Sequence, residues 1–397
     1  MIKEKIQKLS EQYLDEFIQI RRYLHSHPEL SFKEHETSFF ILSWLENLGL
    51  VPVKMANTGV VVTIHGEKKG SKVQPKTIAL RADIDALPLN EMNNIPYKSR
   101  TENVMHACGH DAHTASLLGT AKILTELKDE FEGSVKLIFQ PAEEKLPGGA
   151  ITMIKEGVLE NPRPRSIFAQ HVIPEIPTGK VGFKTGKYMA STDEIYIRIT
   201  GKGGHAAIPW NVVDPVLITS QLILALQQIV SRNAKSTTPT VLSFGKVIAN
   251  GSTNIIPDDV FIEGTFRTFD EEWRAEAHKK IKSITTNLVK SLGGKAKIEI
   301  RKGYPVLVNN PKLTEKTKSY AIEYLGAENV LDIDQRMTAE DFSYFSHEIP
   351  ACFYRLGIGN EAKRTTVPLH NSSFNVDEES LKTGMGLMAF LAVKSLE

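Results

Sequence analysis

Several apolar, β-branched runs in this chain end directly in side chains that can bind a metal ion. The runs and the residues that follow them are 76–82 before Asp83 and Asp85, 135–139 before Glu143 and Glu144, and 166–170 before His171. Such runs predict buried strands, and here they alternate with helical patterns, which favours an α/β fold around a mostly parallel sheet. Because sites in α/β proteins lie at strand ends, these side chains should gather at one edge of the sheet.

The pattern of elements changes near Ser191. From there the expected order is strand, helix, strand, strand, helix, strand, at 194–200, 212–230, 240–249, 260–266, 271–292 and 295–301. This is the split βαβ plan of a ferredoxin-like α+β domain. Elsewhere we expect helices at 2–24, 34–48, 114–127, 311–325 and 378–396, and strands at 60–65 and 351–356. The sequence therefore predicts a catalytic domain in two parts, 1–190 and 303–397, interrupted by an insert at 191–302.

Length and composition are those of a soluble, globular, two-domain protein. The 397 residues exceed one ordinary core, and a net charge of +1 gives no sign of a nucleic-acid or membrane partner. The charged N-terminal helix does not resemble a signal peptide. Only two cysteines, Cys108 and Cys352, exclude a disulfide framework and fit a reducing cytoplasm. We interpret the Lys-rich stretch 67–72 as a solvated turn.

The residue types at the predicted strand ends form a ligand set for divalent transition metals, because thiolate, imidazole and carboxylate occur together. The five candidate ligands are Cys108, His110, Glu144, His171 and His370. Five donors exceed what one tetrahedral zinc needs and suit two ions about 3.5–4 Å apart, with Cys108 as the bridge. Each residue alone has a simpler explanation: a lone cysteine is usually a small buried apolar residue. Zinc, manganese, cobalt and nickel all suit such donors.

The adjacent carboxylates Glu143 and Glu144 allow a division of roles, with one binding metal while Glu143 acts as general base. Asp83 and Asp85 are candidates for carboxylates that orient the imidazole ligands, or for a cap or turn before Pro88. Asp111 and His113 directly follow the ligands and could either support them or begin the next helix.

Five motifs in one order resemble a known family. They are Arg81-Ala-Asp-Ile-Asp-Ala-Leu-Pro88, Met105-His-Ala-Cys-Gly-His-Asp-Ala-His113, Gln140-Pro-Ala-Glu-Glu144, Gln170-His-Val172 and Leu369-His-Asn371. The chain is similar to the dinuclear metallo-amidohydrolases of the aminoacylase and carboxypeptidase superfamily. The Cys-Gly-His-Asp motif resembles the branch of hippurate hydrolases, auxin-conjugate hydrolases, bacterial N-acyl-L-amino acid amidohydrolases and N-acetyldiaminopimelate deacetylases.

The resemblance implies the five metal ligands, Glu143 as base, and an insert that serves as lid and dimerisation domain. It also implies that His205, in Gly201-Lys-Gly-Gly-His-Ala-Ala207, holds the carbonyl oxygen of the substrate bound in the active site of the partner subunit. Asn254 and Arg267 match lid positions near the substrate, and Glu340 matches a pocket motif and could support the site. A strand arginine could bind a free α-carboxylate through its two-pronged guanidinium, or form a structural salt bridge.

Together these features predict a cytoplasmic, two-metal hydrolase that cleaves N-acyl-L-amino acids, with an acetyl, benzoyl or similar acyl group, through a metal-bridging water activated by Glu143. The alternatives are a metallo-aminopeptidase or dipeptidase, an N-acetyldiaminopimelate deacetylase, and a non-catalytic metal-binding protein on the same fold. The expected partners are a small-molecule substrate and a second copy of the chain, as a homodimer or a tetramer.

Overall fold

The computed structural model describes residues 1–68 and 76–397 and divides the chain into two compact units. The first contains Met1–Tyr188, Val308–Asp334 and Asp341–Glu397, and the second contains Met189–Leu307 and Gln335–Glu340. The predicted insert, 191–302, did not include the segment Gln335–Glu340. Of the Lys-rich turn expected at 67–72, residues 69–72 lie outside the described residues.

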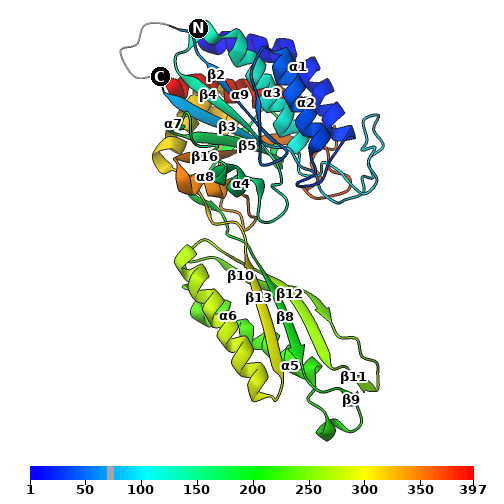
Figure 1. Cartoon of the computed structure of the whole chain (residues 1–397). Helices are drawn as coiled ribbons and strands as arrows, with labels where there is room; N and C mark the ends of the chain where they lie inside the picture. Colours follow the sequence, from blue (N-terminus) through cyan, green and yellow to red (C-terminus); the bar gives the residue numbers. More distant parts are fainter. Residues whose placement is uncertain (69–75) are drawn as a thin grey trace. The chain divides into compact units, whose positions relative to one another are not determined.

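The first unit is built on an eight-stranded sheet (Figure 1). In sheet order its strands are β1 (Val53–Met55), β2 (Gly59–His65), β4 (Ser134–Gln140), β3 (Thr77–Asp83), β5 (Ile167–Pro177), β16 (Ala351–Gly359), β6 (Val181–Phe183) and β15 (Val330–Asp332). The central strands β4, β3, β5 and β16 run parallel, so their carboxyl ends meet at one edge. The predicted α/β class with a mostly parallel sheet is confirmed.

Helices enclose this sheet on both faces. The main hydrophobic core lies between the sheet and α1 (Ile2–Ser26), α2 (His35–Asn47), α3 (His110–Glu126), α7 (Pro311–Leu325) and α9 (Ser380–Leu396). The short helices α4 (Gly149–Lys155) and α8 (Ser343–Glu348) contact each other, on the side of the sheet away from α1 in Figure 1. Helix α3 is buried along almost its whole length: after the polar first turn with His110, Asp111 and His113, most of its residues are small or apolar.

Helix α3 begins four residues before its expected start at Thr114, and this places His110 in its first turn. The reason is Gly109, which precedes the helix with φ +87°, a conformation that favours glycine. A Cβ at this position would lie 2.3 Å from Cγ2 of Val172. Gly109 therefore lets the Cys108 loop turn into the helix while it packs closely against β5.

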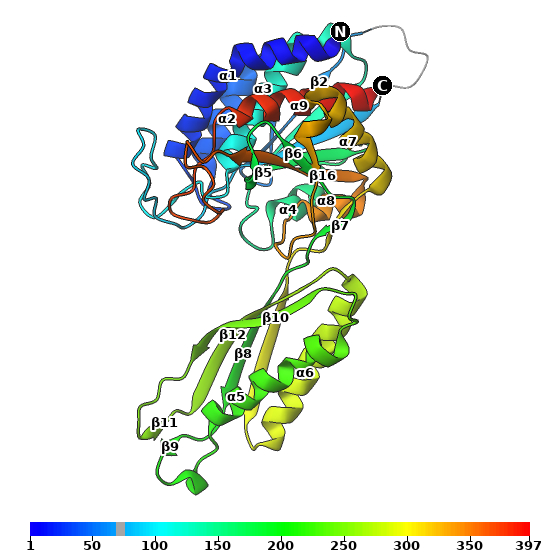
Figure 2. The ribbon, with the colours of Figure 1, turned by 180° about the vertical axis from the view of Figure 1, so that it is seen from behind.

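The second unit contains a four-stranded antiparallel sheet with two helices on one face (Figure 2). The sheet order is β10 (Thr240–Ile248), β12 (Asp259–Thr268), β8 (Asp193–Thr200) and β13 (Lys295–Lys302), with helices α5 (Pro215–Leu226) and α6 (Glu271–Ser291). The chain order β8-α5-β10-β12-α6-β13 confirms the expected ferredoxin-like plan. Helix α5 ends before the predicted residue 230, because Ile229–Asn233 forms a π-helical turn.

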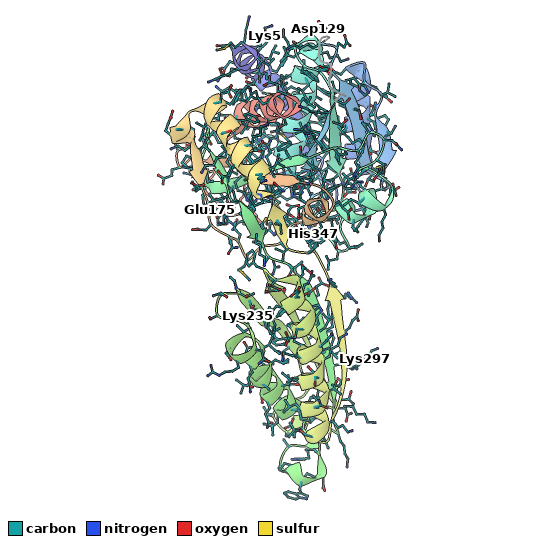
Figure 3. The ribbon with its side chains drawn as sticks, turned by 90° about the vertical axis from the view of Figure 1, so that its left-hand side faces the viewer. Lys5, Asp129, Glu175, Lys235, Lys297 and His347 are labelled. Atoms are coloured by element: carbon teal, nitrogen blue, oxygen red, sulfur yellow. The ribbon has the colours of Figure 1, made fainter. Side chains whose placement is uncertain are left out.

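Side-chain alternation on the edge strand β13 separates the core of the second unit from solvent. Lys295, Lys297 and Glu299 are exposed, whereas Ala296 and Ile298 pack against the core. Figure 3 shows Lys297 pointing outward, as do Lys5 and Asp129 on the first unit. None of the helices in the described part of the chain has the length and hydropathy that a membrane crossing requires. The strands β7 (Gly186–Met189) and β14 (Leu307–Asn309), where the chain passes between the units, pair with each other.

Candidate metal centre

The five predicted ligands fall into two groups of donor atoms that share Cys108. One group is Cys108, His110 and His171, and the other is Cys108, Glu144 and His370; within each group the donor atoms lie within 4.8 Å of one another. Residues separated by as much as 262 positions meet here because they gather at the carboxyl edge of the parallel strands. This is the arrangement expected for two ions with a shared ligand. His171 lies within β5 and not after it, since this strand continues past the expected end at residue 170 to Pro177.

Two of the histidines are oriented by backbone carbonyls. Nδ1 of His110 lies 2.9 Å from the carbonyl oxygen of Asp85, and Nδ1 of His171 lies 2.7 Å from that of Val172. A carbonyl can only accept, so each Nδ1 donates its hydrogen, and Nε2 is the nitrogen that can offer a lone pair when the ring is neutral. Nε2 of His171 faces Sγ of Cys108 at 3.4 Å. The neutral form of each imidazole is therefore the tautomer that a metal ligand needs.

Buried polar atoms in the cluster fit a cation. Nε2 of His110 is fully buried and makes no hydrogen bond with any described residue. Oε1 of Glu144 lies 3.2 Å from Nε2 of His370 and 3.9 Å from Nε2 of His110. A buried polar atom without a hydrogen-bond partner costs free energy, and a cation bound in place of a proton would satisfy these atoms. The sulfur, nitrogen and oxygen donors together suit a transition metal.

The electrostatics of the cluster also favour added positive charge. Burial raises the pKa of the Cys108 thiol, and the neighbouring Glu144 and Glu143 raise it further. Burial alone would lower the pKa of His110, but Asp83 and Asp85 raise it to about 10. The acidic side chains therefore stabilise positive charge at His110, and they would stabilise a divalent cation bound there in the same way.

The carboxylates predicted to orient the imidazoles have separate partners. Oδ1 of Asp85 lies 3.2 Å from Nδ1 of His110, whereas Oδ1 of Asp83 lies 2.5 Å from Nδ1 of His113. Nε2 of His113 accepts from the backbone N–H of Val172, so both its nitrogens are used and it ties α3 to β5. Asp85 thus supports a candidate ligand directly. Asp83 binds His113 instead, and its Oδ2 lies 3.5 Å from Nε2 of His110.

Asp111 lies in the first turn of α3, and its side chain is held from the opposite side by α1. Arg21 donates to its Oδ2 at 2.7 Å, and Nδ1 of His25 lies 2.8 Å from the same oxygen. All three side chains are fully buried. Of the two roles considered for Asp111, the structure shows the helix-starting position together with an ion pair that fixes α3 to α1.

Glu143 is buried beside the candidate ligands, with 7% of its surface exposed. One of its carboxylate oxygens lies within 4.8 Å of donor atoms of both His110 and Glu144. The loop after β4 that holds it contains Ala142 at φ +52°, a left-handed conformation that is uncommon for residues with a Cβ. This loop geometry places two consecutive carboxylates on the same cluster.

The candidate substrate residues of the second unit lie in two places. His205 in β9 (Gly204–His205) pairs with Ile255 in β11 (Ile255–Ile256), and the carbonyl oxygen of Asn254 accepts from Ala206 N–H. Arg267 lies near the other end of β12, eight residues from the strand's start, or about 26 Å at the rise of an extended strand. The structure brings His205 and Asn254 together and separates them from Arg267. Glu340 is buried at the end of the segment Gln335–Glu340.

Sequence reasoning did not identify two residues that contact the loops of the cluster. Ser31 donates to Oδ2 of Asp85 at 2.6 Å, and Oε1 of Glu34 accepts from the backbone N–H of Ala142 at 2.8 Å. Both belong to the turn between α1 and α2, which the sequence marks only by the helix break at Pro28. An acidic residue in such a turn would ordinarily be taken for a helix cap, so no local signal indicates this contact.

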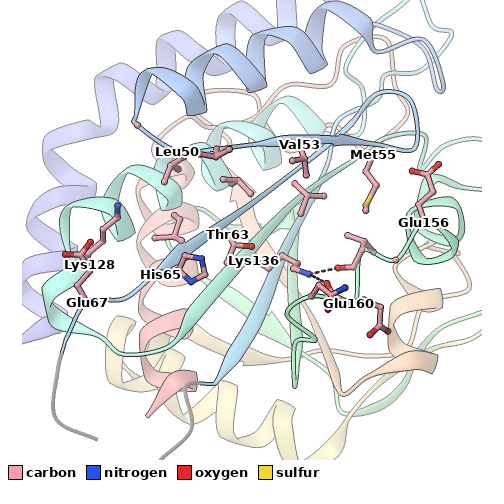
Figure 4. A pocket seen from close by; sticks show the side chains of 18 residues that line it. Leu50, Val53, Met55, Thr63, His65, Glu67, Lys128, Lys136, Glu156 and Glu160 are labelled. Carbon is pink, nitrogen blue, oxygen red and sulfur yellow. Dashed lines mark hydrogen bonds between the residues drawn. The ribbon is translucent and has the colours of Figure 1, made fainter.

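A cavity of about 690 Å³ lies elsewhere on the first unit (Figure 4). Its lining includes Val53, Met55, Thr63 and His65 from β1 and β2 and Lys136 from β4. The Lys136 ammonium donates to the carbonyl oxygens of Val158 and Glu160, the contacts drawn dashed in Figure 4. None of the predicted site residues is among those that line it, so this cavity is separate from the candidate metal centre.

Comparisons with known proteins agree with the geometry. Residues 79–394 match the family model of peptidase family M20/M25/M40. The N-acetylcysteine deacetylase of Bacillus subtilis (strain 168) is 40% identical over 384 residues, which is 96% of this chain and 97% of that protein. Thermostable carboxypeptidase 2 of Saccharolobus solfataricus is 38% identical, covering 98% of each chain. The crystal structure of Bacillus subtilis YXEP, described as a dinuclear metal-binding peptidase of the M20 family, superposes with a TM-score of 0.81 at 35% identity, covering 97% of this chain and 99% of that one.

Proposed function

The chain belongs to peptidase family M20/M25/M40, a family of hydrolytic amidohydrolases and peptidases, and we propose that within it this enzyme cleaves the amide bond of N-acyl-L-amino acids. The products are a carboxylate and a free amino acid. The observation that carries the proposal is the pair of donor groups sharing Cys108, with the Glu143 carboxylate beside them.

Cys108, His110 and His171 would hold one divalent ion, and Cys108, Glu144 and His370 the other. Zinc, manganese, cobalt and nickel all suit these donors. When bound, such ions polarise a substrate carbonyl and lower the pKa of water. The free thiol of Cys108, which the proposal requires in its reduced form, supports a cytoplasmic location.

The chemistry then depends on Glu143 as a carrier of one proton. Its carboxylate takes a proton from the attacking water as the new C–O bond forms, and delivers it to the amide nitrogen as the C–N bond breaks. The leaving nitrogen departs as a neutral amine and the acyl product forms as a carboxylic acid, whose remaining water proton then passes to the amine or to solvent to give the carboxylate. Because Glu143 is buried beside the donors, its charge is poorly screened by solvent and the transfer distance is short.

Arg267 is the candidate for binding the free α-carboxylate of the substrate. Its Nη1 donates to the carbonyl oxygen of Met337, and no described carboxylate bonds to it, so the alternative of a structural salt bridge is not supported. Burial lowers the pKa of its guanidinium, which nonetheless stays charged at neutral pH. Arg267 also lines a cavity of about 520 Å³ on the sheet of the second unit. A half-buried cation beside a cavity favours an anionic ligand group.

A panel of substrates tests the proposed reaction. We expect the metal-loaded enzyme to hydrolyse N-acetyl- and N-benzoyl-amino acids at least about tenfold faster, by kcat/KM, than unblocked dipeptides. The carboxamide analogues of the same substrates should be poorer, because a charged hydrogen bond contributes about 1.5–3 kcal/mol. Product amine can be followed with ninhydrin or by mass spectrometry.

Because one relative is named a carboxypeptidase, the panel must also include N-blocked peptides. Faster release of the C-terminal residue from such peptides than from N-acyl amino acids would replace the proposed activity with a carboxypeptidase. Preference for N-acetyldiaminopimelate would narrow the substrate to that compound. Hydrolysis of none of them would contradict the proposal.

We further propose a homodimer, or a tetramer built from it, formed through the second unit. Helix α5 exposes Leu217 and Leu224, the latter with 72% of its surface accessible, and the edge strand β10 exposes Val247 and Ile248. Exposed aliphatic side chains and an unpaired strand edge favour association with another chain. The separation of His205 from Arg267 along β12 supports a role for His205 in the partner's site.

Mixing two inactive variants tests this shared site. His205→Ala and Glu143→Ala subunits should each be inactive alone, and a mixture should regain up to roughly a quarter of wild-type activity, because random pairing leaves some dimers with one intact site. Subunit exchange is checked with differently tagged chains. No recovery despite proven exchange would remove the role of His205 in the partner's site.

A further inference from the structure

The carboxylate of Glu34 joins three separate backbone and side-chain groups near the candidate metal centre. Glu34 is fully buried, at 0% exposure, in the turn between α1 and α2. Its Oε1 accepts from the backbone N–H groups of Phe32, at 3.0 Å, and Ala142, at 2.8 Å. Its Oε2 accepts from the hydroxyl of Thr58 at 2.7 Å. The bond to Ala142 spans 108 residues and reaches the residue just before Glu143.

Both backbone groups bound by Oε1 belong to residues in the left-handed region. Phe32 has φ +67° and Ala142 has φ +52°. This conformation is unfavourable for residues with a Cβ and persists where surrounding contacts hold it. One carboxylate oxygen thus holds two strained residues, one of which sets the direction of the chain into Glu143.

The backbone after Glu143 is also linked to the turn between α1 and α2, in this case through the carboxylate of Asp85. Oδ2 of Asp85 accepts from the backbone N–H of Glu144 at 3.0 Å and from the hydroxyl of Ser31 at 2.6 Å. Glu34 therefore binds the N–H of the peptide between Pro141 and Ala142, one residue before Glu143, and Ser31 reaches the peptide between Glu143 and Glu144 through Asp85. The backbone is thus hydrogen-bonded on both sides of Glu143.

A helix-capping role does not explain Glu34. It occupies the residue before α2, yet its side chain makes no capping hydrogen bond to that helix. Glu29 performs this function instead, since its carboxylate accepts from the backbone N–H groups of Glu36 and Thr37 and from the Thr37 hydroxyl. Both glutamates lie in the turn between α1 and α2, but only Glu34 binds the loop that contains Glu143, through Ala142.

We propose that Glu34 is a positioning residue for Glu143, fixing the left-handed turn at Ala142 so that the Glu143 carboxylate is held at the candidate metal centre. The inference rests on the proposed function, in which Glu143 carries the proton. Among the described residues, the hydrogen bonds of the Glu34 carboxylate go to Phe32, Thr58 and Ala142 and not to a candidate ligand. Its contribution is geometric, since a displacement of about 1 Å at a reacting group can cost on the order of 10²-fold in rate.

The test compares variants of Glu34 in the full-length, metal-loaded enzyme. Glu34→Ala removes the carboxylate that accepts from Ala142, and Glu34→Asp shortens the side chain by one methylene. Both variants should lower kcat about 10–100-fold and leave KM and metal content unchanged. Glu34→Gln keeps one oxygen for both backbone N–H groups and offers its NH₂ to Thr58, so it should retain kcat within about threefold. Glu29→Ala is the matched control and should lower thermal stability without lowering kcat.

Two further measurements separate positioning from general destabilisation. In the metal-free protein, Glu34→Ala should increase amide hydrogen exchange at residues 140–144, whereas Glu29→Ala should do so only in α2. In a double-mutant cycle, adding Glu34→Ala to Glu143→Gln should cost little beyond Glu143→Gln alone, because both act on one proton transfer.

Three results would overturn the inference: unchanged kcat in Glu34→Asp, equal kcat losses in Glu34→Gln and Glu34→Asp, or fully multiplicative losses in the cycle. If Glu34→Ala does not fold, the comparison of Asp with Gln still decides. A fully active Glu143→Gln would instead contradict the proposed function, because the base would then be another group.

Discussion

Replacing Glu143 by glutamine should lower kcat by about 10²–10⁴-fold, the range that a general acid–base group contributes. Glutamine preserves the shape of the side chain but cannot accept the proton from water. KM should change little, because the substrate contacts proposed for Arg267 and His205 lie on other elements. Steady-state kinetics on an N-acyl amino acid, with saturating metal, measure this directly.

The neighbouring residue Glu144 provides the matched control. Both carboxylates lie in one loop, but only Glu144 shares a donor group with Cys108 and His370. We therefore expect Glu144→Gln to lose bound metal, measured by elemental analysis after dialysis, and Glu143→Gln to retain two equivalents per chain. The reverse pattern, with metal lost from Glu143→Gln and kept by Glu144→Gln, would exchange the roles of the two residues.

The candidate ligands could be found from the sequence because each follows an apolar run or lies in a recognisable motif. Strand ends of a parallel sheet meet at one edge, so the position of His171 after one run and Glu144 after another already predicts that they converge. The fold class and the order of elements in the second unit follow from the same local periodicity. The bounds of the helices were less accurate where one glycine or one π-helical turn decides the end, as at Gly109 and Ile229–Asn233.

The supporting contacts could not be found in this way because they are not local. Glu34 lies in a turn between two helices, and its partner Ala142 is 108 residues away on a loop with no distinct composition. The sequence also gives no sign that Ala142 has a left-handed φ, because alanine favours helical backbone over a strained turn. Only the packed structure shows that the oxygen of Glu34 holds this turn in place.

Replacing Cys108 by serine should leave the fold intact and weaken metal binding severely. A thiol ionises on coordination, whereas a serine hydroxyl stays protonated near neutral pH. Because Cys108 belongs to both donor groups, its loss should affect both ions. We expect a larger decrease than the roughly 10–100-fold that loss of an outer hydrogen-bonding partner produces, for which Asp85→Asn is the comparison. Competition with a chromophoric chelator measures the affinities.

Metal affinity should depend on pH, and the pKa values of Cys108 and His110 determine whether it rises or falls. Burial and the neighbouring glutamates raise the pKa of the Cys108 thiol in the metal-free protein, and Asp83 and Asp85 raise that of His110 to about 10. Both groups are therefore protonated at neutral pH without metal, and binding must release those protons. Affinity should rise with pH, by about a factor of ten per pH unit for each proton released. In Cys108→Ser this slope should decrease by about one proton.

Cys352 supplies the matched control, because it is the second cysteine of the chain and lies fully buried in β16 within the main core. Its Cys352→Ser variant places the same hydroxyl in the buried core and should lower thermal stability while leaving metal affinity and its pH slope as in wild type. Equal metal affinity and slope in Cys108→Ser and Cys352→Ser would mean that the thiolate of Cys108 does not bridge the ions. The two donor groups would then have no common member, and a two-ion site centred on this sulfur would have to be abandoned.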